Sequence, residues 1–120
     1  MFARLTIMQI QPERIPEAVR LYKASVVPEA RRQKGFRGIC LLADTNSGKG
    51  ISATFWRNEA DALANEENLY YQEQLVKFLS MLSGPMIREG YEVDVHCLEN
   101  MARSKPAAKR TPARKRKGAS

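Results

Sequence analysis

The sequence predicts one small α+β domain whose elements follow the order βαββαβ. Two observations support this order. Two regions of helical apolar spacing lie between segments with the composition and alternation of strands. A loop rich in glycine, asparagine and serine joins the two middle strand segments, as in a β-hairpin. A body of about 100 residues holds a single hydrophobic core, so we assign residues 1–100 to one domain.

The first strand and the first helix are predicted from a change in the spacing of apolar residues. Residues 2–10, FARLTIMQI, mix branched and aliphatic side chains with polar ones, which suits a strand. In residues 14–27 the apolar spacing becomes that of one helical stripe. The stripe consists of Ile15, Val19, Tyr22 and Val26. Pro28 interrupts it, so the following residues are either a kinked continuation of the helix or a new turn that ends at Gly35.

A hairpin, a second helix and a last strand complete the order. Residues 36–44 and 51–56 are apolar runs around the turn TNSGKG. Asn58 suits the cap of a helix with acidic residues in its first turn. The apolar spacing predicts that this helix runs to Leu82, with a bend or a division into two short helices in residues 64–72. Residues 88–97, REGYEVDVHC, alternate as a strand.

Alternate residues of these strands form two faces of unlike chemistry. One face is nearly all apolar and comprises Ala3, Leu5, Ile7, Ile51, Ala53, Phe55, Tyr91, Val93 and Val95. The other face is mixed and comprises Arg4, Thr6, Met8, Ser52, Thr54, Trp56, Glu92, Asp94 and His96. The alternation leaves open which face the helices cover. The uncovered face is solvated, paired with a second subunit or part of a pocket.

The positive charge of the chain is concentrated at its C-terminal end. The chain has 20 Lys and Arg against 13 Asp and Glu, but eight of the basic residues and none of the acidic ones follow Asn100. Residues 101–120 have no aromatic or branched aliphatic side chain, so we expect a disordered basic tail. It is a solubilising extension, a nonspecific binder of nucleic acid or another polyanion, or a localisation or membrane-surface patch. Its candidate polyanion contacts are Lys109, Arg110, Arg114, Lys115, Arg116 and Lys117.

Composition also bears on the compartment. No segment is apolar over the roughly 18 residues that a membrane-spanning helix needs, and the first residues lack the three-part pattern of a secretory signal. We therefore expect a cytoplasmic protein with no membrane partner. In that compartment Cys40 and Cys97 are expected to be free, buried thiols and not a disulfide.

Residues 26–64 carry a resemblance to a known family. They contain a helix end, Gly-Phe-Arg-Gly entering a strand, a short turn with Gly-Lys, and an aromatic-Trp strand end that leads into a helix. With the order βαββαβ, these features resemble the antibiotic biosynthesis monooxygenase superfamily over roughly residues 1–98. The resemblance implies a ferredoxin-like monomer with an antiparallel sheet. It also implies a homodimer in which two sheets form a dimeric α+β barrel, with a ligand cavity between sheet and helices.

The same resemblance implies a choice of reactions. Members of the superfamily include cofactor-independent oxygenases of hydroxylated aromatic polyketides, quinol oxygenases and haem-degrading enzymes. The haem-degrading members have an Asn in the first strand and a Trp and a His on the second helix, where this chain has Thr6, Asn65 and Leu75. We therefore reject haem degradation. Many members have a histidine at the place of Asn65. Cofactor-free oxygenation stays open, because it needs a dry pocket, a proton acceptor and polar groups that stabilise an anion.

Three residues are candidates for catalysis. Trp56 lies at a strand end, where its indole N–H orients an aromatic substrate or its ring anchors the core. Asn65 either stabilises an oxyanion or is an exposed polar residue at the helix bend. His96 is either a general base near neutral pH or a surface residue at the end of an edge strand.

Five further residues are candidates for binding a small aromatic ligand. They are Arg4, Thr6, Thr54, Tyr70 and Tyr71. Arg4 and Thr6 bind a phenolate or carboxylate of the ligand, or they pair with Glu92 or Asp94 across the sheet. The two tyrosines flank the helix bend, where one is expected to pack and the other to reach water.

Other sites are excluded by residue type and spacing. SGKGIS resembles a phosphate-binding loop, but Ala43 takes the place of its leading glycine and Gly50 that of its magnesium-binding Ser or Thr. His96 and Cys97 are adjacent and point to opposite faces of a strand, which prevents a Cys-His catalytic pair. One histidine and two separated thiols make no zinc-binding pattern. No metal and no cofactor are expected.

Two functions follow from these observations. The first is a homodimeric barrel that binds a small aromatic or quinonoid compound and oxygenates it without metal or flavin. The second is a non-catalytic barrel, a ligand binder or an interaction module, whose tail recruits it to nucleic acid or another polyanion. The missing family histidine favours the second function, and the mixed face with Trp56 favours the first.

Overall fold

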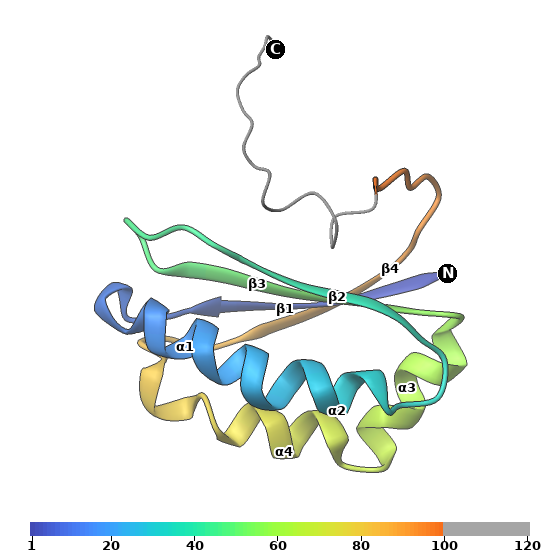
Figure 1. The fold of residues 1–120 in the computed structure, drawn as a ribbon, viewed down its shortest axis with the longest axis horizontal. Helices are drawn as coiled ribbons and strands as arrows, with labels where there is room; N and C mark the ends of the chain where they lie inside the picture. Colours follow the sequence, from blue (N-terminus) through green and yellow to red (C-terminus); the bar gives the residue numbers. More distant parts are fainter. Residues whose placement is uncertain (100–120) are drawn as a thin grey trace, which may run out of the picture.

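A computed structural model describes residues 1–99 and shows a sheet with its helices on one face (Figure 1). The strands are β1 (Phe2–Gln9), β2 (Phe36–Ala43), β3 (Lys49–Trp56) and β4 (Ile87–Glu92). They form one antiparallel sheet in the order β2-β3-β1-β4. The predicted α+β, ferredoxin-like βαββαβ fold is confirmed.

Two helical segments cover the sheet (Figure 1). The first comprises the turn η1 (Pro12–Arg14), α1 (Ile15–Leu21), η2 (Tyr22–Val26) and α2 (Val27–Arg31). The second comprises α3 (Glu59–Glu67), α4 (Tyr70–Val76) and the turn η3 (Leu79–Met81). A hydrogen bond of 2.9 Å from the Ser25 hydroxyl to Oε1 of Gln74 links the two segments.

The first helix continues past Pro28 through a widened turn. Pro28 has no N–H and its ring crowds the carbonyl group four residues back, so a regular α-helical bond is lost there. The preceding turn η2 is π-helical, and the N–H of Val27 bonds the carbonyl oxygen of Tyr22 five residues back. The kinked continuation is therefore the correct alternative. Ile15, Tyr22 and Val26 are buried, as the predicted stripe requires.

The second helix divides in two, as its broken spacing predicts. Leu69 has a left-handed φ of 69° and separates α3 from α4. The prediction that the helix runs to Leu82 is wrong, because α4 ends at Val76. Beyond it the N–H of Phe78 bonds the carbonyl oxygen of Leu75, three residues back, so the chain tightens into 3-10 turns.

Asp44 holds the turn between β2 and β3. Its carboxylate accepts the N–H of Asn46 at 3.1 Å and the hydroxyl of Ser47 at 2.8 Å. Gly48 has a φ of +86° and approaches Ile10 so closely that a Cβ there would lie 2.0 Å from the Ile10 carbonyl oxygen. SGKGIS is thus part of a hairpin turn, as predicted.

The last strand is shorter than predicted, and this changes the position of His96. β4 ends at Glu92, which lies opposite Phe2 at the start of β1. After one more bond, from the N–H of Val93 to the carbonyl oxygen of Met1, no residue of β1 remains opposite. The predicted strand beyond Glu92 is therefore wrong, and His96 lies exposed outside the sheet.

The helices cover the mixed face of the sheet. Arg4 lies opposite Thr54, and Thr6 lies opposite Ser52 on this face. The main hydrophobic core lies between this face and the helices and comprises Met8, Ile10, Ile15, Ala18, Tyr22, Val26, Phe78 and Met81. The nearly apolar face lies on the side away from the helices.

The two cysteines are free, as predicted, but both are exposed and not buried. Cys40 lies opposite Ala53 on the uncovered face of the sheet. Cys97 lies beyond the end of β4, where no helix covers it.

Residues 100–120 lie outside the described part of the chain. They include the end of the predicted domain at Asn100 and the whole predicted basic tail. The candidate polyanion contacts placed there are Lys109, Arg110, Arg114, Lys115, Arg116 and Lys117. Within residues 1–99, no helix has the length and apolarity needed to cross a membrane.

Gly48→Ala is expected to destabilise the domain by about 2 kcal/mol, because the new Cβ collides with backbone and the left-handed φ strains any L side chain. Gly84→Ala is the matched control, since a Cβ there meets only the side chain of Gln9 at 3.7 Å. Urea denaturation measures both variants. Equal free energies of unfolding for Gly48→Ala and the parent would contradict this account of the turn.

Candidate functional site

A cavity lies between the helix-covered face of the sheet and the two helical segments. Its volume is about 70 Å³, and it is partly open to solvent. Apolar side chains such as Met8, Val26 and Phe78 form much of the wall. Polar side chains enter it from the sheet and from the α3–α4 bend, so the cavity is a site where a few polar groups meet an apolar surface.

Seven of the eight residues predicted for the folded site line this cavity. They are Arg4, Thr6, Thr54, Trp56, Asn65, Tyr70 and Tyr71. His96 is the exception, because it is exposed in the segment after β4 and does not line the cavity. The structure brings the seven together, and their catalytic and ligand-binding roles stay predictions.

Trp56 anchors the core, which is one of the two roles that the sequence offered as alternatives. It is the last residue of β3 and is only 1% exposed. Its ring meets Phe36 edge-on with the ring centroids 6.4 Å apart, as a core anchor does. Its indole N–H has no hydrogen-bond partner among the described residues. A buried N–H without a partner costs about 1–3 kcal/mol.

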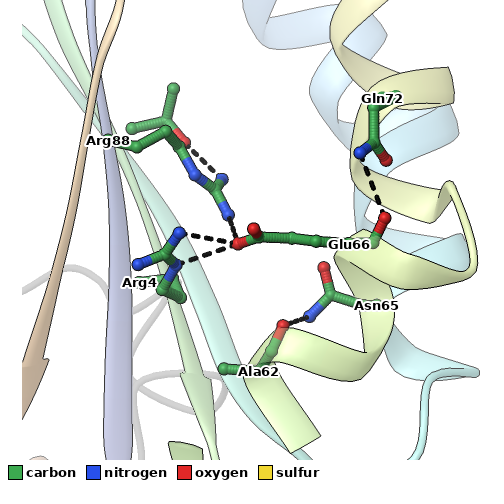
Figure 2. A network of polar contacts seen from close by, with 7 residues as sticks. Arg4, Ala62, Asn65, Glu66, Gln72 and Arg88 are labelled. Atoms are coloured by element: carbon green, nitrogen blue, oxygen red, sulfur yellow. Dashed lines mark hydrogen bonds and ion pairs between the residues drawn. The ribbon is translucent and has the colours of Figure 1, made fainter.

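Asn65 is a buried wall residue and not the exposed residue that one alternative predicted. The cap at Asn58, whose side chain accepts the N–H of Asp61 at 2.9 Å, fixes where α3 begins. Two turns later the helix directs Asn65 towards the sheet, where it is 4% exposed. Its Nδ2 donates to the carbonyl oxygen of Ala62 (Figure 2). The amide is therefore held in one orientation at the cavity.

Glu66 joins α3 to two strands. Its Oε2 accepts bonds from Nε and Nη2 of Arg4 at 3.0 and 2.7 Å, and a further bond from Nη2 of Arg88 (Figure 2). Arg88 also donates from Nη1 to the Thr6 hydroxyl at 2.9 Å. The guanidinium carbon of Arg88 lies 3.6 Å from the ring centroid of Tyr71, a cation–π contact. We call Arg4, Glu66 and Arg88 the charge cluster.

The charge cluster replaces the pairing that sequence reasoning offered for Arg4. A pair with Glu92 or Asp94 is wrong, because Arg4 lies opposite Gly90 and Asp94 lies beyond the end of β4. Sequence reasoning also missed Arg88 and Glu66. The alternation contained a signal for Arg88, because it lies two residues before Gly90 and therefore on the mixed face.

Burial and charge act in opposite directions on Glu66. Burial raises the pKa of this carboxyl group, but hydrogen bonds and charge from Arg88 and Arg4 together outweigh it and lower the pKa below its usual value. Burial raises the pKa of Tyr22, against the opposing effect of its hydrogen bond with Ser52. Burial also raises the pKa of Tyr70 to about 12. At neutral pH Tyr22 and Tyr70 therefore line the cavity as neutral phenols, and the ionised Glu66 lies behind Arg4 and Arg88 of the cavity wall.

The donors at the cavity suit an organic ligand better than a metal ion. Within residues 1–99, no three His, Cys, Asp or Glu side chains lie together in a way that could hold a metal ion. Glu66 is already paired with two guanidinium groups, which repel a further cation.

Comparison with known proteins identifies the fold. No family model and no curated protein sequence matches this chain. A solved structure of a monooxygenase from the gene ActVA-Orf6 of Streptomyces coelicolor, in complex with the ligand nanaomycin D, superposes with a TM-score of 0.66 at 19% identity. The match covers 82% of this chain and 92% of that one. The chain has the fold of the antibiotic biosynthesis monooxygenase superfamily.

Further structures share the antibiotic biosynthesis monooxygenase fold with this chain. Rv0793 from Mycobacterium tuberculosis superposes with a TM-score of 0.64 at 13% identity, over 81% of this chain and 98% of its own. A protein named antibiotic biosynthesis monooxygenase superposes with a TM-score of 0.63 at 15% identity, over 78% and 98% of the two chains. The resemblance found in the sequence is confirmed at the level of the fold.

Glu66→Gln is expected to lower the free energy of unfolding by about 1 kcal/mol at pH 7, because two part-buried guanidinium groups lose their shared carboxylate. A carboxylate whose pKa is lowered by folding adds stability above its unfolded pKa of about 4.3, and this stability is lost as the pH falls through the folded pKa. The difference between parent and variant should therefore be constant above about pH 5.5 and shrink below about pH 4.

Denaturant unfolding at several pH values measures this difference. Glu67→Gln, at an exposed neighbouring position of α3, is the matched control and should change stability little. A difference for Glu66→Gln that does not depend on pH would contradict the role of its charge.

Proposed function

We propose that this chain is a homodimeric, cofactor-independent oxygenase of a hydroxylated aromatic compound or a quinol. The observation that carries the proposal is the buried, unpartnered indole N–H of Trp56 at a largely apolar cavity. Such a cavity favours an apolar ring that presents an oxygen to the N–H group. The shared fold with the monooxygenase of Streptomyces coelicolor, which was solved with nanaomycin D, supports this reaction class.

Oxygenation without a cofactor takes its electrons from the substrate. A hydroxylated aromatic compound such as an anthrone loses a proton, and the electron-rich anion then reduces O2. A methylene carbon becomes a carbonyl carbon: one oxygen atom of O2 forms the new C=O, and the other leaves as water with the two hydrogens of the methylene group. The protein has to exclude water, stabilise the anion and orient it towards O2.

The cavity residues divide these tasks in the proposal. Trp56 donates to the substrate oxygen, and the amide of Asn65 lies at the same cavity, held by its bond to Ala62. Tyr70 stays protonated at neutral pH and is available as a second donor. His96 has no role in this reaction, because it lies away from the cavity. The substrate proton therefore passes to solvent.

The uncovered face of the sheet supports the homodimer. Leu42, Ile87 and Tyr91 are each more than half exposed on or beside this face. Leu5 and Phe55 lie on the same face. A sheet face with exposed apolar side chains is a candidate interaction site. A second copy of the chain covers it, sheet against sheet, in the dimeric α+β barrel.

Oxygen uptake by the metal-free protein, with a panel of anthrones, hydroquinones and catechols, tests the reaction. Trp56→Phe and Asn65→Ala are each expected to reduce uptake by roughly tenfold or more, because each removes a polar group that stabilises the anion. His96→Ala is the control and should keep the parent rate. No uptake with any substrate by folded, dimeric protein would favour the non-catalytic binding module.

Ile87→Glu is expected to convert the dimer to a monomer, because it places a charge in the apolar interface. Leu79→Glu is the matched control, since Leu79 is equally exposed, at 53%, but lies in the helical layer. Sedimentation velocity measures the mass of each variant. A parent protein that sediments as a monomer at micromolar concentrations would refute the dimer.

A further inference from the structure

The cavity carries an unbalanced positive charge. Arg4 and Arg88 are the charged residues that line it in the described chain, and both bind the one carboxylate of Glu66. Guanidinium groups stay protonated in proteins, and Glu66 is ionised at neutral pH. The three side chains are only 20%, 26% and 22% exposed, in the order Arg4, Glu66, Arg88. One net positive charge is therefore held beside an apolar space, where water screens it less than at the surface.

Two residues that line the cavity each have an N–H group without a partner among residues 1–99. Arg88 donates from Nη1 to Thr6 and from Nη2 to Glu66, which fixes its guanidinium group. Its Nε is buried and unpaired within the described residues, as is Nε1 of Trp56. A ligand oxygen would satisfy such donors, and an anionic oxygen would do so with roughly twice the strength of a neutral one.

We propose that the cavity binds an aromatic anion with one negative charge on oxygen, a phenolate or a carboxylate, and that Glu66 sets this charge selectivity. The inference rests on the proposed function and names the charge of its substrate. Two guanidinium groups alone would attract a dianion, and Glu66 neutralises one of them. The aromatic part of the ligand follows from the rings of Trp56, Tyr70 and Phe78 in the wall.

Binding of benzoate and benzamide, which are close in shape and differ in charge, tests this on the full chain. Trp56 is the one tryptophan of the sequence, so its indole N–H gives a single signal in a ¹H–¹⁵N spectrum. Benzoate should bind roughly tenfold more tightly than benzamide, because only benzoate is attracted by the net charge. Arg88→Gln or Arg4→Gln should remove this preference.

Glu66→Gln separates selectivity from a purely structural role. It should tighten benzoate binding by roughly tenfold and leave benzamide binding unchanged, since the cluster gains one net positive charge. The conservative change Glu67→Gln on the same helix should alter neither affinity. If Glu66→Gln does not fold, the two arginine variants decide the question.

p-Nitrophenol distinguishes a phenolate site from a carboxylate site, because its phenolate form absorbs visible light. If the bound compound shows phenolate absorbance at a lower pH than in free solution, and Arg88→Gln does not show this shift, the site binds a phenolate. If the protein prefers benzoate but does not shift p-nitrophenol, the site binds a carboxylate. Equal affinities of the parent for benzoate and benzamide together with an unshifted p-nitrophenol would overturn the proposal. Binding requires no turnover, so a failure of oxygen uptake leaves this result unaffected.

Discussion

Glu66 is the one carboxylate through which α3 holds two strands, and the arrangement of the site follows from it. The helices of this domain cover a sheet face that contains Arg4, Thr6 and Thr54, a face that apolar packing alone does not stabilise. The carboxylate compensates by accepting bonds from β1 and β4 at once. These bonds fix the position of α3 on the sheet, and they do so without filling the cavity beside the helix.

The same attachment explains why a cavity exists at all. Arg88 is held by Glu66, by the Thr6 hydroxyl and by the Tyr71 ring, so its guanidinium group cannot fold into the space that it borders. Asn65, the neighbour of Glu66 on α3, is turned back onto its own helix by its bond to Ala62. Arg88, Thr6 and Asn65 each have a partner within the protein, and in the described part of the chain the buried side-chain donors without one are Nε1 of Trp56 and Nε of Arg88.

Local signals in the sequence were sufficient for the order of the elements, and long-range contacts were not. The cap at Asn58, the hairpin turn TNSGKG and the break near Leu69 each depend on a few neighbouring residues, and each was predicted correctly. The end of β4 depends on where β1 begins, so the alternation through His96 was misleading. The partner of Arg4 lies 62 residues away on another element, and no spacing rule of a single strand points to it.

Pro28 predicted only part of the structure of the first helix. Pro28 indicated that the helix is irregular there, but the sequence did not distinguish a widened turn from the end of the helix.

The alternation of the strands did not show which face of the sheet the helices cover, because both faces contain large apolar side chains. Met8 and Trp56 on the mixed face outweigh its polar residues once the helices supply partners for them.

The strand order also determines when the domain can form. β1, at the beginning of the described chain, lies between β3 and β4, so both of its neighbours are synthesised long after it. Pairing over such sequence distances is slow, since the intervening chain must first be closed into loops. Until then Leu5 and Ile7 have no sheet to join, and after folding they lie on the face without helices. The folding of one chain therefore leaves these side chains only half-buried, and in the proposed homodimer the second chain would complete their removal from water.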